Sequence, residues 1–463
     1  MSDFRPYRWS AEKVTVDGLR YRVSLADHIL RDQRGEAEAS MFGFSYTACA
    51  DDSRRPVLFA YNGGPGAASN WLHMGLLGPK LADMPGYPAV ELPMKFTLAD
   101  NTASLLDICD IVLIDPVGTG WTRLFDQSSA SKHYSTEGDA RDFAGFICAW
   151  LADNGRPDAP VYLLGESYGT IRNMALADVL PENVNLRGII SVGTSLNVGA
   201  KTSLPVEPNI RRLGANAASC WYHHHKAQLP LEEFVAQAMD FAYGDYAHAL
   251  LLGSRLPEKE HDNVLKRLSY FTGVSEAFLQ AHKLRFGEVD FLLQLCPGSV
   301  VSAYDSRLLF RPDHGEKYSG NTFSAVKILE PDMKQDLFMS AVGPVFDEAF
   351  RTYADTELCP PEGRETAADI LSIERQWDFC GYGKDTLSLP VELMSRRPAL
   401  RMMFVNGYYD LMSTFDFMTY YLSQYDLPAG RTECVVMPAG HASYVGSGMA
   451  AELSQKIRGF IKK

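Results

Sequence analysis

Short apolar runs recur through the first half of the chain. Each run is a few residues long, rich in β-branched or aromatic residues, and bounded by glycine, proline or aspartate. Such runs are typical of strands that are buried on both faces of a parallel sheet. They are PVLFAYN (56–62), DIVLIDPV (110–117), PVYLLGE (160–166) and GIISVGT (188–194).

Helical patterns lie between these runs, at 139–154 and 168–180. Their apolar residues recur three and four positions apart, as on the buried face of a helix. Because strands and helices alternate, the sequence predicts an α/β fold built on a doubly wound, mostly parallel sheet. Two later runs, at 399–410 and 433–441, predict further strands of the same sheet.

Positions 199–376 have a different pattern, which helical periodicity dominates, as in LEEFVAQAMDFAYGDYAHALLLG. A helical block between two strands of one sheet is typical of an inserted cap. Such caps cover an active site and shape its pocket. We therefore expect a core made of residues 1–198 and 377–463, with a helical cap of residues 199–376 inserted between its two parts.

The strongest local motif is the pentapeptide Gly165-Glu166-Ser167-Tyr168-Gly169. It directly follows a predicted strand and directly precedes a predicted helix. In such a G-x-S-x-G elbow the turn is so tight that only small residues fit two positions either side of the serine. The motif in this context is typical of the α/β-hydrolase fold. We predict that fold, with Ser167 as nucleophile; the alternative is an ordinary loop serine.

A serine hydroxyl needs a base within hydrogen-bond reach, and in this fold the chain order is serine, acid, histidine. His441 lies in a loop after the last predicted strand, where Gly440 permits a turn back toward the serine. Asp410, at the carboxyl end of the run RMMFVNGYY, is predicted to orient the imidazole and to stabilise the imidazolium. Asp416 is the rival acid, but the amphipathic stretch around it favours a helix.

A glycine-rich loop, Asn62-Gly63-Gly64-Pro65-Gly66, follows the first predicted strand. Glycines after an early strand let backbone N–H groups approach a substrate carbonyl closely, as in lipases and esterases. The second donor would be the N–H of Tyr168, directly after the nucleophile. Together these groups predict an oxyanion hole, in which one donor typically contributes about 3 kcal/mol to the transition state.

His223, His224 and His225 form a run of three consecutive histidines. Adjacent residues do not face the same way on a helix or a strand, so the three imidazoles cannot easily converge on one metal ion. We therefore expect neither a metal nor another cofactor.

The charge balance and the absence of long apolar segments narrow the class of protein. The formal net charge is −13, from 57 acidic and 44 basic residues, which argues against nucleic-acid binding because that requires a basic surface. No apolar stretch is long enough to cross a bilayer, and the N-terminus carries no secretory signal. We therefore expect no membrane partner, and we expect the eight cysteines to be reduced, mostly buried thiols of a cytoplasmic protein.

Taken together, these motifs resemble the serine carboxypeptidase family. The family's hallmarks stand here in the right order and span nearly the whole predicted core. A further stretch, Trp71 to Gly75 with Gly78-Pro79 after it, looks like the bacterial branch of that family. The matching segments are Asn62 to Gly66, Asp115 to Gly120, Gly165 to Gly169, Gly407 to Asp410, and Gly440-His441.

The resemblance implies an exopeptidase that removes residues from peptide C-termini through an acyl-enzyme. It implies that Ser167, Asp410 and His441 form the catalytic triad. The N–H groups of Gly64 and Tyr168 would then form the oxyanion hole.

The resemblance also implies that Asn62 and Glu166 bind the terminal carboxylate of a peptide substrate. Glu166 could do so only when it is protonated or shares a proton, because two carboxylates repel each other. The chain departs from the family at Leu76, where a second glutamate is frequent, and at Ala60, where tryptophan is frequent. Ala67 stands where the family frequently has cysteine, which agrees with a chain that does not rely on that disulfide.

Three functions stay open from the sequence. The leading hypothesis is a serine carboxypeptidase-like peptidase. The second is an esterase or acyltransferase with the same triad. Leu76 and Ala60 favour it, because both replace residues of the family's carboxylate-binding network. The third is a binding protein without catalysis, against which the three intact triad residues argue. We expect a peptide or small acyl substrate, and the sequence does not predict the oligomeric state.

Overall fold

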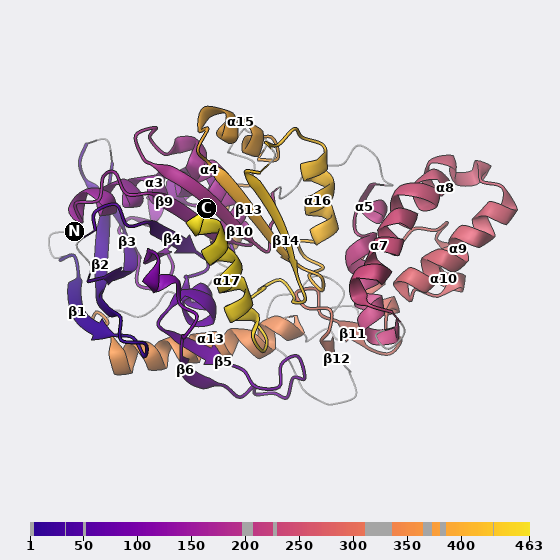
Figure 1. The fold of residues 1–463 in the computed structure, drawn as a ribbon, viewed down its shortest axis with the longest axis horizontal. Helices are drawn as coiled ribbons and strands as arrows, with labels where there is room; N and C mark the ends of the chain where they lie inside the picture. Colours follow the sequence, from indigo (N-terminus) through magenta and orange to yellow (C-terminus); the bar gives the residue numbers. More distant parts are fainter. Residues whose placement is uncertain are drawn as a thin grey trace.

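A ten-stranded sheet forms the centre of the molecule (Figure 1). The computed structural model describes residues 4–32, 34–49, 52–196, 207–225, 229–310, 336–363, 373–379, 386–428 and 430–463. In sheet order the strands are β1 (Arg8–Val14), β2 (Arg20–Arg31), β3 (Ala37–Ala48), β7 (Asp110–Asp115), β4 (Val57–Tyr61), β9 (Val161–Glu166), β10 (Leu186–Val192), β13 (Arg401–Gly407) and β14 (Thr432–Met437), with β8 (Arg123–Leu124) paired to β3.

The strands predicted from apolar runs are confirmed, and they form the parallel part of the sheet. From β7 through β4, β9, β10 and β13 to β14, every neighbouring pair is parallel. Strands β4, β7 and β9 are buried along their whole length, as expected of strands with covered faces. The prediction of a doubly wound, mostly parallel sheet is therefore correct.

Three strands at the N-terminal end were not predicted. β1, β2 and β3 pair in antiparallel order and join the parallel part through β7. Along β2, buried residues alternate with exposed or half-buried ones over much of the strand. A strand with one solvent-exposed face has no continuous apolar run. Continuous runs therefore do not reveal such a strand.

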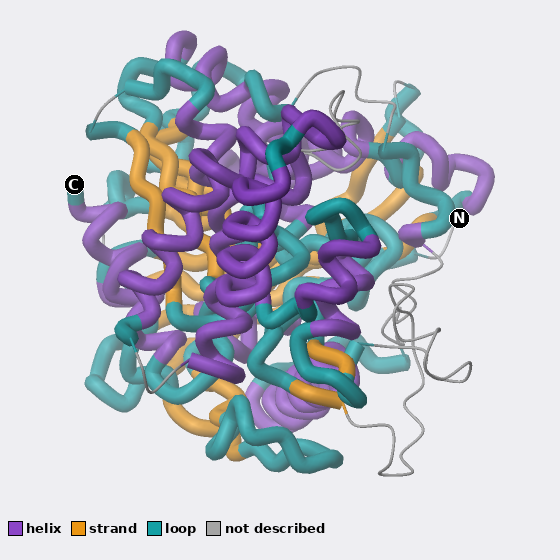
Figure 2. The backbone as a smooth tube through the Cα atoms, turned by 90° about the vertical axis from the view of Figure 1, so that its right-hand side faces the viewer, coloured by secondary structure: helices purple, strands orange, loops and turns teal. Residues whose placement is uncertain are grey.

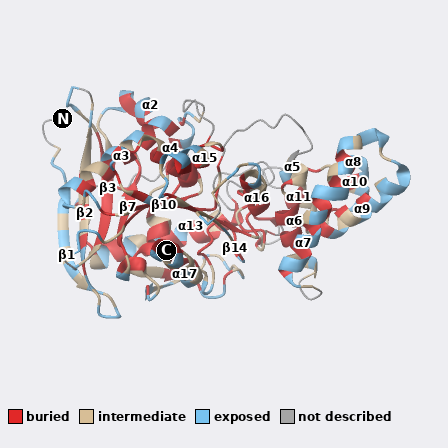
Figure 3. Cartoon of the chain, turned by 45° about the horizontal axis from the view of Figure 1, so that its top comes forward, coloured by how far each residue is buried: buried red, intermediate tan, exposed pale blue. Residues whose placement is uncertain are grey.

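Hydrophobic side chains cover both faces of the sheet. Along β9, Val161 and Leu163 belong to one cluster of buried residues, whereas Tyr162 and Leu164 belong to a second cluster. Because successive side chains of a strand point to opposite faces, each cluster lies on one face. Buried residues accordingly gather on the strands and on the helix sides that face them (Figure 3).

Helices from both parts of the core build these two clusters. Helices α3, α4 and α15 contribute to the first, while α17 contributes to the second. The core helices are α2 (Ala130–His133), α3 (Thr136–Asp153), α4 (Tyr168–Val179), α15 (Leu389–Arg396), α16 (Phe415–Ser423) and α17 (Met449–Lys462).

The described part of the segment between β10 and β13 is mostly helical. These two strands pair directly, so the whole segment is inserted between neighbouring strands of one sheet. Several of its helices project from one end of the sheet in Figure 1, and they stand in front of the strands in Figure 2. They are α5 (Glu207–Ile210), α6 (Leu213–Cys220), α7 (Leu231–Phe241), α8 (Ala247–Leu252), α9 (Glu258–Thr272), α10 (Glu276–Ala281) and α11 (Glu288–Gln294).

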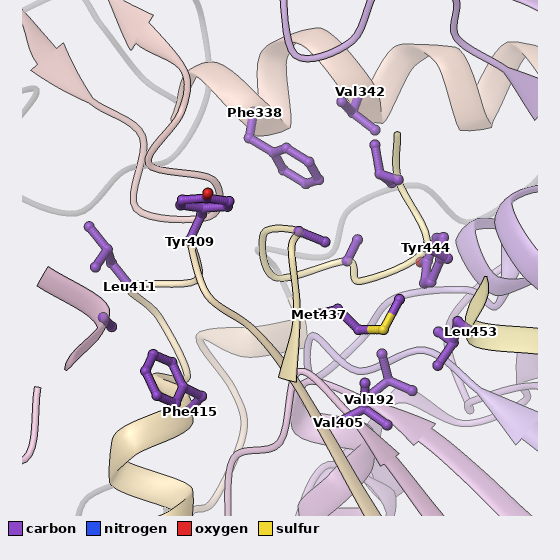
Figure 4. Close-up of a cluster of buried hydrophobic side chains, with 14 of the residues drawn as sticks. Val192, Phe338, Val342, Val405, Tyr409, Leu411, Phe415, Met437, Tyr444 and Leu453 are labelled. Atoms are coloured by element: carbon purple, nitrogen blue, oxygen red, sulfur yellow. The ribbon is translucent and has the colours of Figure 1, made fainter. Parts of the chain in front are cut away.

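Helix α13 (Leu337–Glu357) belongs to the same inserted segment but packs against the core. It contacts α1 (Asn70–Leu72), the π-helix at His73–Leu77 and β5 (Lys80–Asp83), which pairs with β6 (Thr97–Asp100). In Figure 4 the ring of Phe338 points from α13 toward the loops that follow β13 and β14. The boundaries of the predicted cap, 199–376, stay a prediction.

The burial of the cysteines differs from the expectation. Cys109 and Cys220 are buried, but Cys49, Cys359 and Cys434 are exposed, so the prediction of mostly buried thiols is wrong. Among the helices that the structure describes, none has both the length and the hydropathy required to span a bilayer.

Candidate active site

The predicted nucleophile lies in a strained turn between a strand and a helix. β9 ends at Glu166, α4 begins at Tyr168, and Ser167 between them has φ 56° and ψ −122°. A positive φ is costly for a residue with a side chain, and it is typical of a strained functional turn. Ser167 is half-buried while both neighbours are buried, so the turn lifts the serine out of the core.

The two glycines of the elbow are required because the chain doubles back on itself. A Cβ at Gly165 would lie 2.1 Å from the carbonyl oxygen of Gly169, closer than any real contact. A Cβ at Gly169 would lie 3.1 Å from the carbonyl oxygen of Tyr61 in β4. The motif therefore reflects backbone packing around Ser167.

The predicted base and the predicted acid are in contact. His441 Nδ1 lies 2.9 Å from Asp410 Oδ2, and the two side chains are almost fully buried. The other oxygen, Oδ1, accepts the backbone N–H groups of Met412 at 2.8 Å and Ser413 at 2.9 Å. These bonds fix the carboxylate, and the carboxylate in turn orients the imidazole so that Nε2 is left for the nucleophile.

The electrostatic surroundings favour a protonated imidazole. Burial alone would lower the pKa of His441, but the Asp410 carboxylate and the charge of Glu166 together hold that pKa above its usual value. A base with this property takes up a proton readily when a nucleophile attacks.

Ser167 and His441 both neighbour the turn after β10. The backbone N–H of Ser167 donates to the carbonyl of Val192 at 2.9 Å. The next residue, Gly193, has φ +59°, and a Cβ there would lie 3.0 Å from the His441 ring. Within the described ranges the Ser167 hydroxyl has no hydrogen bond to the imidazole, so their direct contact stays a prediction. Hydrogen bonds between catalytic groups are often long until substrate binds.

The rival acid has a different place in the fold. Asp416 lies in the first turn of α16, as the amphipathic stretch predicts. Its Oδ2 accepts the backbone N–H of Gly214 at 2.7 Å, at the start of α6. Burial raises the pKa of Asp416 to about 6. This carboxylate therefore links α16 to the inserted helices, and Asp410 is the acid at the imidazole.

The glycine-rich loop packs directly on the elbow. A Cβ at Gly63 would lie 2.5 Å from the backbone nitrogen of Tyr168, and Gly64 has φ +105°. Tyr168 is the first residue of α4, so its N–H has no partner within the helix. The loop after β4 and the start of α4 thus lie side by side, which is the arrangement that the predicted oxyanion hole requires.

Asn62 and Glu166, the predicted carboxylate-binding pair, are in contact with each other. Asn62 Nδ2 donates to Glu166 Oε2, and the Tyr444 hydroxyl donates to the same oxygen at 2.9 Å. The amide oxygen of Asn62 accepts the backbone N–H of Leu72 at 3.0 Å. Tyr444 was not predicted from the sequence; its place three residues after His441 is the only sequence signal for it.

The carboxyl group of Glu166 is poised to change its charge near neutral pH. Burial raises its pKa to about 7, against the opposing effects of His441 and of the Tyr444 hydroxyl. Below this pH the group is mostly neutral. Above this pH the group is a carboxylate, and its negative charge raises the pKa of the His441 imidazole.

The variant Glu166→Gln is expected to move the ascending limb of the pH profile to lower pH. Glutamine carries no charge, so the contribution of Glu166 to the raised pKa of His441 disappears. The measurement is kcat/KM for an uncharged p-nitrophenyl ester across pH, since the ascending limb reports the base of the free enzyme. The exposed Glu91→Gln serves as control and should leave the profile unchanged. A limb that stays in place would contradict this coupling.

A buried ion pair supports the glycine-rich loop from beneath. Arg172 on α4 is fully buried; its Nε donates to Asp139 Oδ2 at 2.6 Å, and a terminal nitrogen donates to the Asn62 carbonyl at 2.7 Å. Its guanidinium lies 4.5 Å from the centre of the Phe143 ring. Arg172 was not predicted from the sequence, although a charged side chain within the apolar pattern 168–180 is a signal for it.

The three consecutive histidines each face a different group. His223 Nε2 lies 2.7 Å from the carbonyl oxygen of Ser306, and His224 Nε2 lies 2.8 Å from that of Leu295. The rings of His224 and His225 are 6.4 Å apart. In the part of the chain that the structure describes, no group of three or more histidine, cysteine or acidic side chains is arranged to hold a metal ion.

Part of the chain is similar to a known protein family. Residues 26–190 match the family model described as serine carboxypeptidase. This segment contains the glycine-rich loop and the elbow. No curated protein matches the chain.

Several solved structures resemble this one at low sequence identity. Esterase E22 shares 12% identity with a TM-score of 0.39, over 99% of this chain and 100% of that one. The peroxisomal alpha-beta-hydrolase Lpx1 from Saccharomyces cerevisiae shares 12% identity with a TM-score of 0.40, over 100% and 91%. A proline iminopeptidase from Mycobacterium smegmatis shares 11% identity with a TM-score of 0.39, over 94% and 97%.

The molecule has the architecture of the α/β-hydrolase fold. A mostly parallel sheet, a strand–elbow–helix turn at Ser167, and an Asp410–His441 pair on later loops are the parts of an α/β-hydrolase. The family match supports a hydrolase. The chain therefore has the α/β-hydrolase fold, and its residues 26–190 match the serine carboxypeptidase family model.

Proposed function

We propose that this protein is a serine hydrolase that cleaves C-terminal peptide bonds through an acyl-enzyme. The observation that carries the proposal is the 2.9 Å contact between His441 and Asp410, on loops at the edge of the sheet where the elbow presents Ser167. A nucleophile, a base and an orienting acid are the groups that acyl transfer requires.

The chemistry follows from these groups. His441 Nε2 takes the proton of Ser167 Oγ as this oxygen bonds to the scissile carbonyl carbon. The oxyanion accepts hydrogen bonds from the N–H groups of Gly64 and Tyr168. The carbon–nitrogen bond then breaks as the imidazolium gives its proton to the leaving amine. Water, deprotonated by His441, attacks the acyl-enzyme, and Ser167 regains its proton as the acid product leaves.

The second candidate keeps this chemistry and changes the substrate to an ester or an acyl acceptor. Two observations favour it. Both ends of the Asn62 side chain already bond to protein groups, and Tyr444 shares the Glu166 oxygen. Leu76, at the place where the family frequently has a second glutamate, is fully buried. Fewer polar groups are therefore left to bind a terminal carboxylate.

A comparison of three substrates separates the two candidates. We expect a blocked dipeptide with a free terminal carboxylate to be cleaved faster than its amide, most of all below pH 7, where Glu166 is neutral. The measurement is kcat/KM for the free acid, the amide and a simple ester across pH. Equal kcat/KM values for the free acid and the amide would show that the enzyme does not recognise a terminal carboxylate. The esterase candidate would then be favoured.

A fluorophosphonate probe tests the hydrolase proposal itself without knowledge of the substrate. We expect covalent labelling of the native protein at Ser167. Labelling should disappear in Ser167→Ala and persist in Ser128→Ala, a control at an exposed serine. No labelling, or labelling that survives in Ser167→Ala, would overturn the proposal.

A further inference from the structure

A short stretch of the inserted segment contacts both catalytic loops. We call residues 302–307 the anchor segment; it lies between β11 (Val300–Val301) and β12 (Leu309–Phe310). It follows the projecting helices in the chain and precedes α13. It therefore connects the inserted helices to the edge of the sheet where His441 and Asp410 meet.

The anchor segment holds the loop of the base. The backbone N–H of His441 donates to the carbonyl of Tyr304 at 2.7 Å. The rings of the same two residues meet edge to face, with centroids 5.3 Å apart and planes at 84°, a favourable aromatic geometry. A Cβ at Gly440 would lie 2.6 Å from the Tyr304 carbonyl oxygen and from Asp305 Cβ. The loop therefore has no room to shift toward the segment.

The anchor segment also holds the loop of the acid. The backbone N–H of Ser306 donates to the carbonyl of Tyr409 at 3.0 Å, and that of Leu411 donates to the carbonyl of Ala303 at 2.9 Å. Tyr409 and Leu411 flank Asp410 on either side. One short segment thus fixes the backbone on both sides of Asp410 and at His441.

Asp305 is the residue that stiffens the segment. Its carboxylate is nearly fully buried, and Arg307 donates to both oxygens, at 2.8 Å from Nε and at 2.5 Å from a terminal nitrogen. The Tyr87 hydroxyl, from outside the inserted segment, donates to the same carboxylate. The other terminal nitrogen of Arg307 donates to the carbonyl of Pro438 at 3.1 Å, three residues before His441. Bidentate, charge-assisted bonds of this kind fix geometry strongly.

The start of the anchor segment is tied to the core helix α13. The Asp336 carboxylate accepts the Ser302 hydroxyl at 2.5 Å and the Ala303 N–H at 2.8 Å. It also caps α13 by accepting the Phe338 N–H at 2.8 Å. The Tyr304 ring stacks on Phe338 with planes at 7°. The anchor segment is thus fixed at both ends.

We propose that Asp305 is a positioning residue: through Arg307 and Tyr87 it holds the anchor segment so that the His441 and Asp410 loops keep their mutual geometry. This inference rests on the proposed function, because positioning matters only if His441 acts as a base toward Ser167. Displacement of a catalytic group by about 1 Å costs on the order of 100-fold in rate. The contacts of Asp305 are therefore expected to affect the chemical step.

The test is the rate at which a fluorophosphonate labels Ser167, which depends on the base. In Asp305→Asn the carboxylate charge opposite Arg307 is lost while the shape is kept. We expect labelling to slow by about 10- to 100-fold. For an ester substrate, kcat should fall by a similar factor while KM changes little, because the Asp305 carboxylate is nearly fully buried and acts only through its protein partners.

A matched control separates positioning from general loss of stability. Asp110 is as buried as Asp305, and it bonds to Arg55 at 3.0 Å and to Arg156 at 2.6 Å. It lies at the first residue of β7, the end of the strand opposite to the catalytic loops. Asp110→Asn should lower the melting temperature and leave the labelling rate at the wild-type value.

Three further variants keep the inference falsifiable if Asp305→Asn fails to fold. Tyr87→Phe removes one hydrogen bond to Asp305 and should slow labelling less than Asp305→Asn. Arg307→Met should slow labelling, and Arg307→Lys, which keeps a cation opposite Asp305, should restore part of the rate.

The outcomes distinguish this inference from the proposed function. If wild-type Ser167 labels and the variants at Asp305, Arg307 and Tyr87 label at the same rate, the positioning role is wrong. Equal slowing in Asp305→Asn and Asp110→Asn would also overturn it, because the effect would then be one of stability alone. If wild-type Ser167 is not labelled, the proposed function is wrong, and the inference is wrong with it.

Discussion

Replacing Ser167 with alanine is expected to lower kcat by about 10⁶-fold with little change in folding stability. Only the hydroxyl group is removed, and Ser167 is half-buried with no side-chain hydrogen bond to the described residues around it. The measurement pairs kcat for an ester substrate with thermal unfolding of the same preparation. A fall in melting temperature together with normal turnover would show that Ser167 is not the nucleophile.

The corresponding change at the base, His441→Ala, is expected to cost a similar factor, because without a base the Ser167 hydroxyl stays protonated. The double variant should be about as slow as either single variant, since the two residues act as a unit. His248→Ala, at an exposed histidine, is the matched control and should keep wild-type turnover. Independent, additive losses in the double variant would contradict a shared step.

The parallel strands were predictable because both of their faces are covered. Strands such as β4 and β9 are buried along their whole length, so their sequences are continuous apolar runs that end at polar or glycine residues. β2 differs because Arg20 and Arg22 face outward. Its pattern of one covered face breaks the apolar run, which explains why β2 was missed.

The site was predictable where chain order constrains it. The chain order of the elbow at Ser167, a late strand and a turn near the C-terminus indicates which acid and which histidine meet. Asp410 and His441 are indeed in contact. The partners that surround them have no such pattern. Tyr444, Asp305 and Arg172 reach the site by packing between elements distant in the chain, and residue type alone does not reveal such contacts.

The docking of the inserted segment was not predictable either, for the same reason. Its helical character follows from the period of its apolar residues, but the place where it docks depends on contacts across the fold. The carbonyl of Tyr304 meets His441, and Asp336 ties Ala303 to the start of α13. Each contact joins residues that are distant in the chain and uses a backbone group on at least one side, and so no local motif predicts it.

Loss of the buried guanidinium in Arg172→Met is expected to destabilise the fold by about 3–5 kcal/mol. The variant leaves the Asp139 carboxylate buried without its cation, and it leaves the Asn62 carbonyl without its donor. The glycine-rich loop should therefore lose support, and turnover should fall as well. Urea unfolding gives the change in free energy. Arg267→Met is the control, because its pair with Asp245 is exposed and should be worth under about 1 kcal/mol.

The direction in which the stability of Arg172→Met changes with pH tests whether the unpaired Asp139 carboxylate causes the loss of stability. Burial raises the pKa of Asp139 to about 6, and Arg172 opposes this rise. Without Arg172 the folded-state pKa climbs further above the ordinary value of 3.8. Stability of the variant is then lost progressively as pH rises through this range, so the deficit should be smaller at acidic than at alkaline pH. Adding Asp139→Asn should recover part of the free energy, because no buried charge remains. A deficit that is independent of pH, or that the second substitution leaves unchanged, would place the cost in lost packing around Arg172 instead.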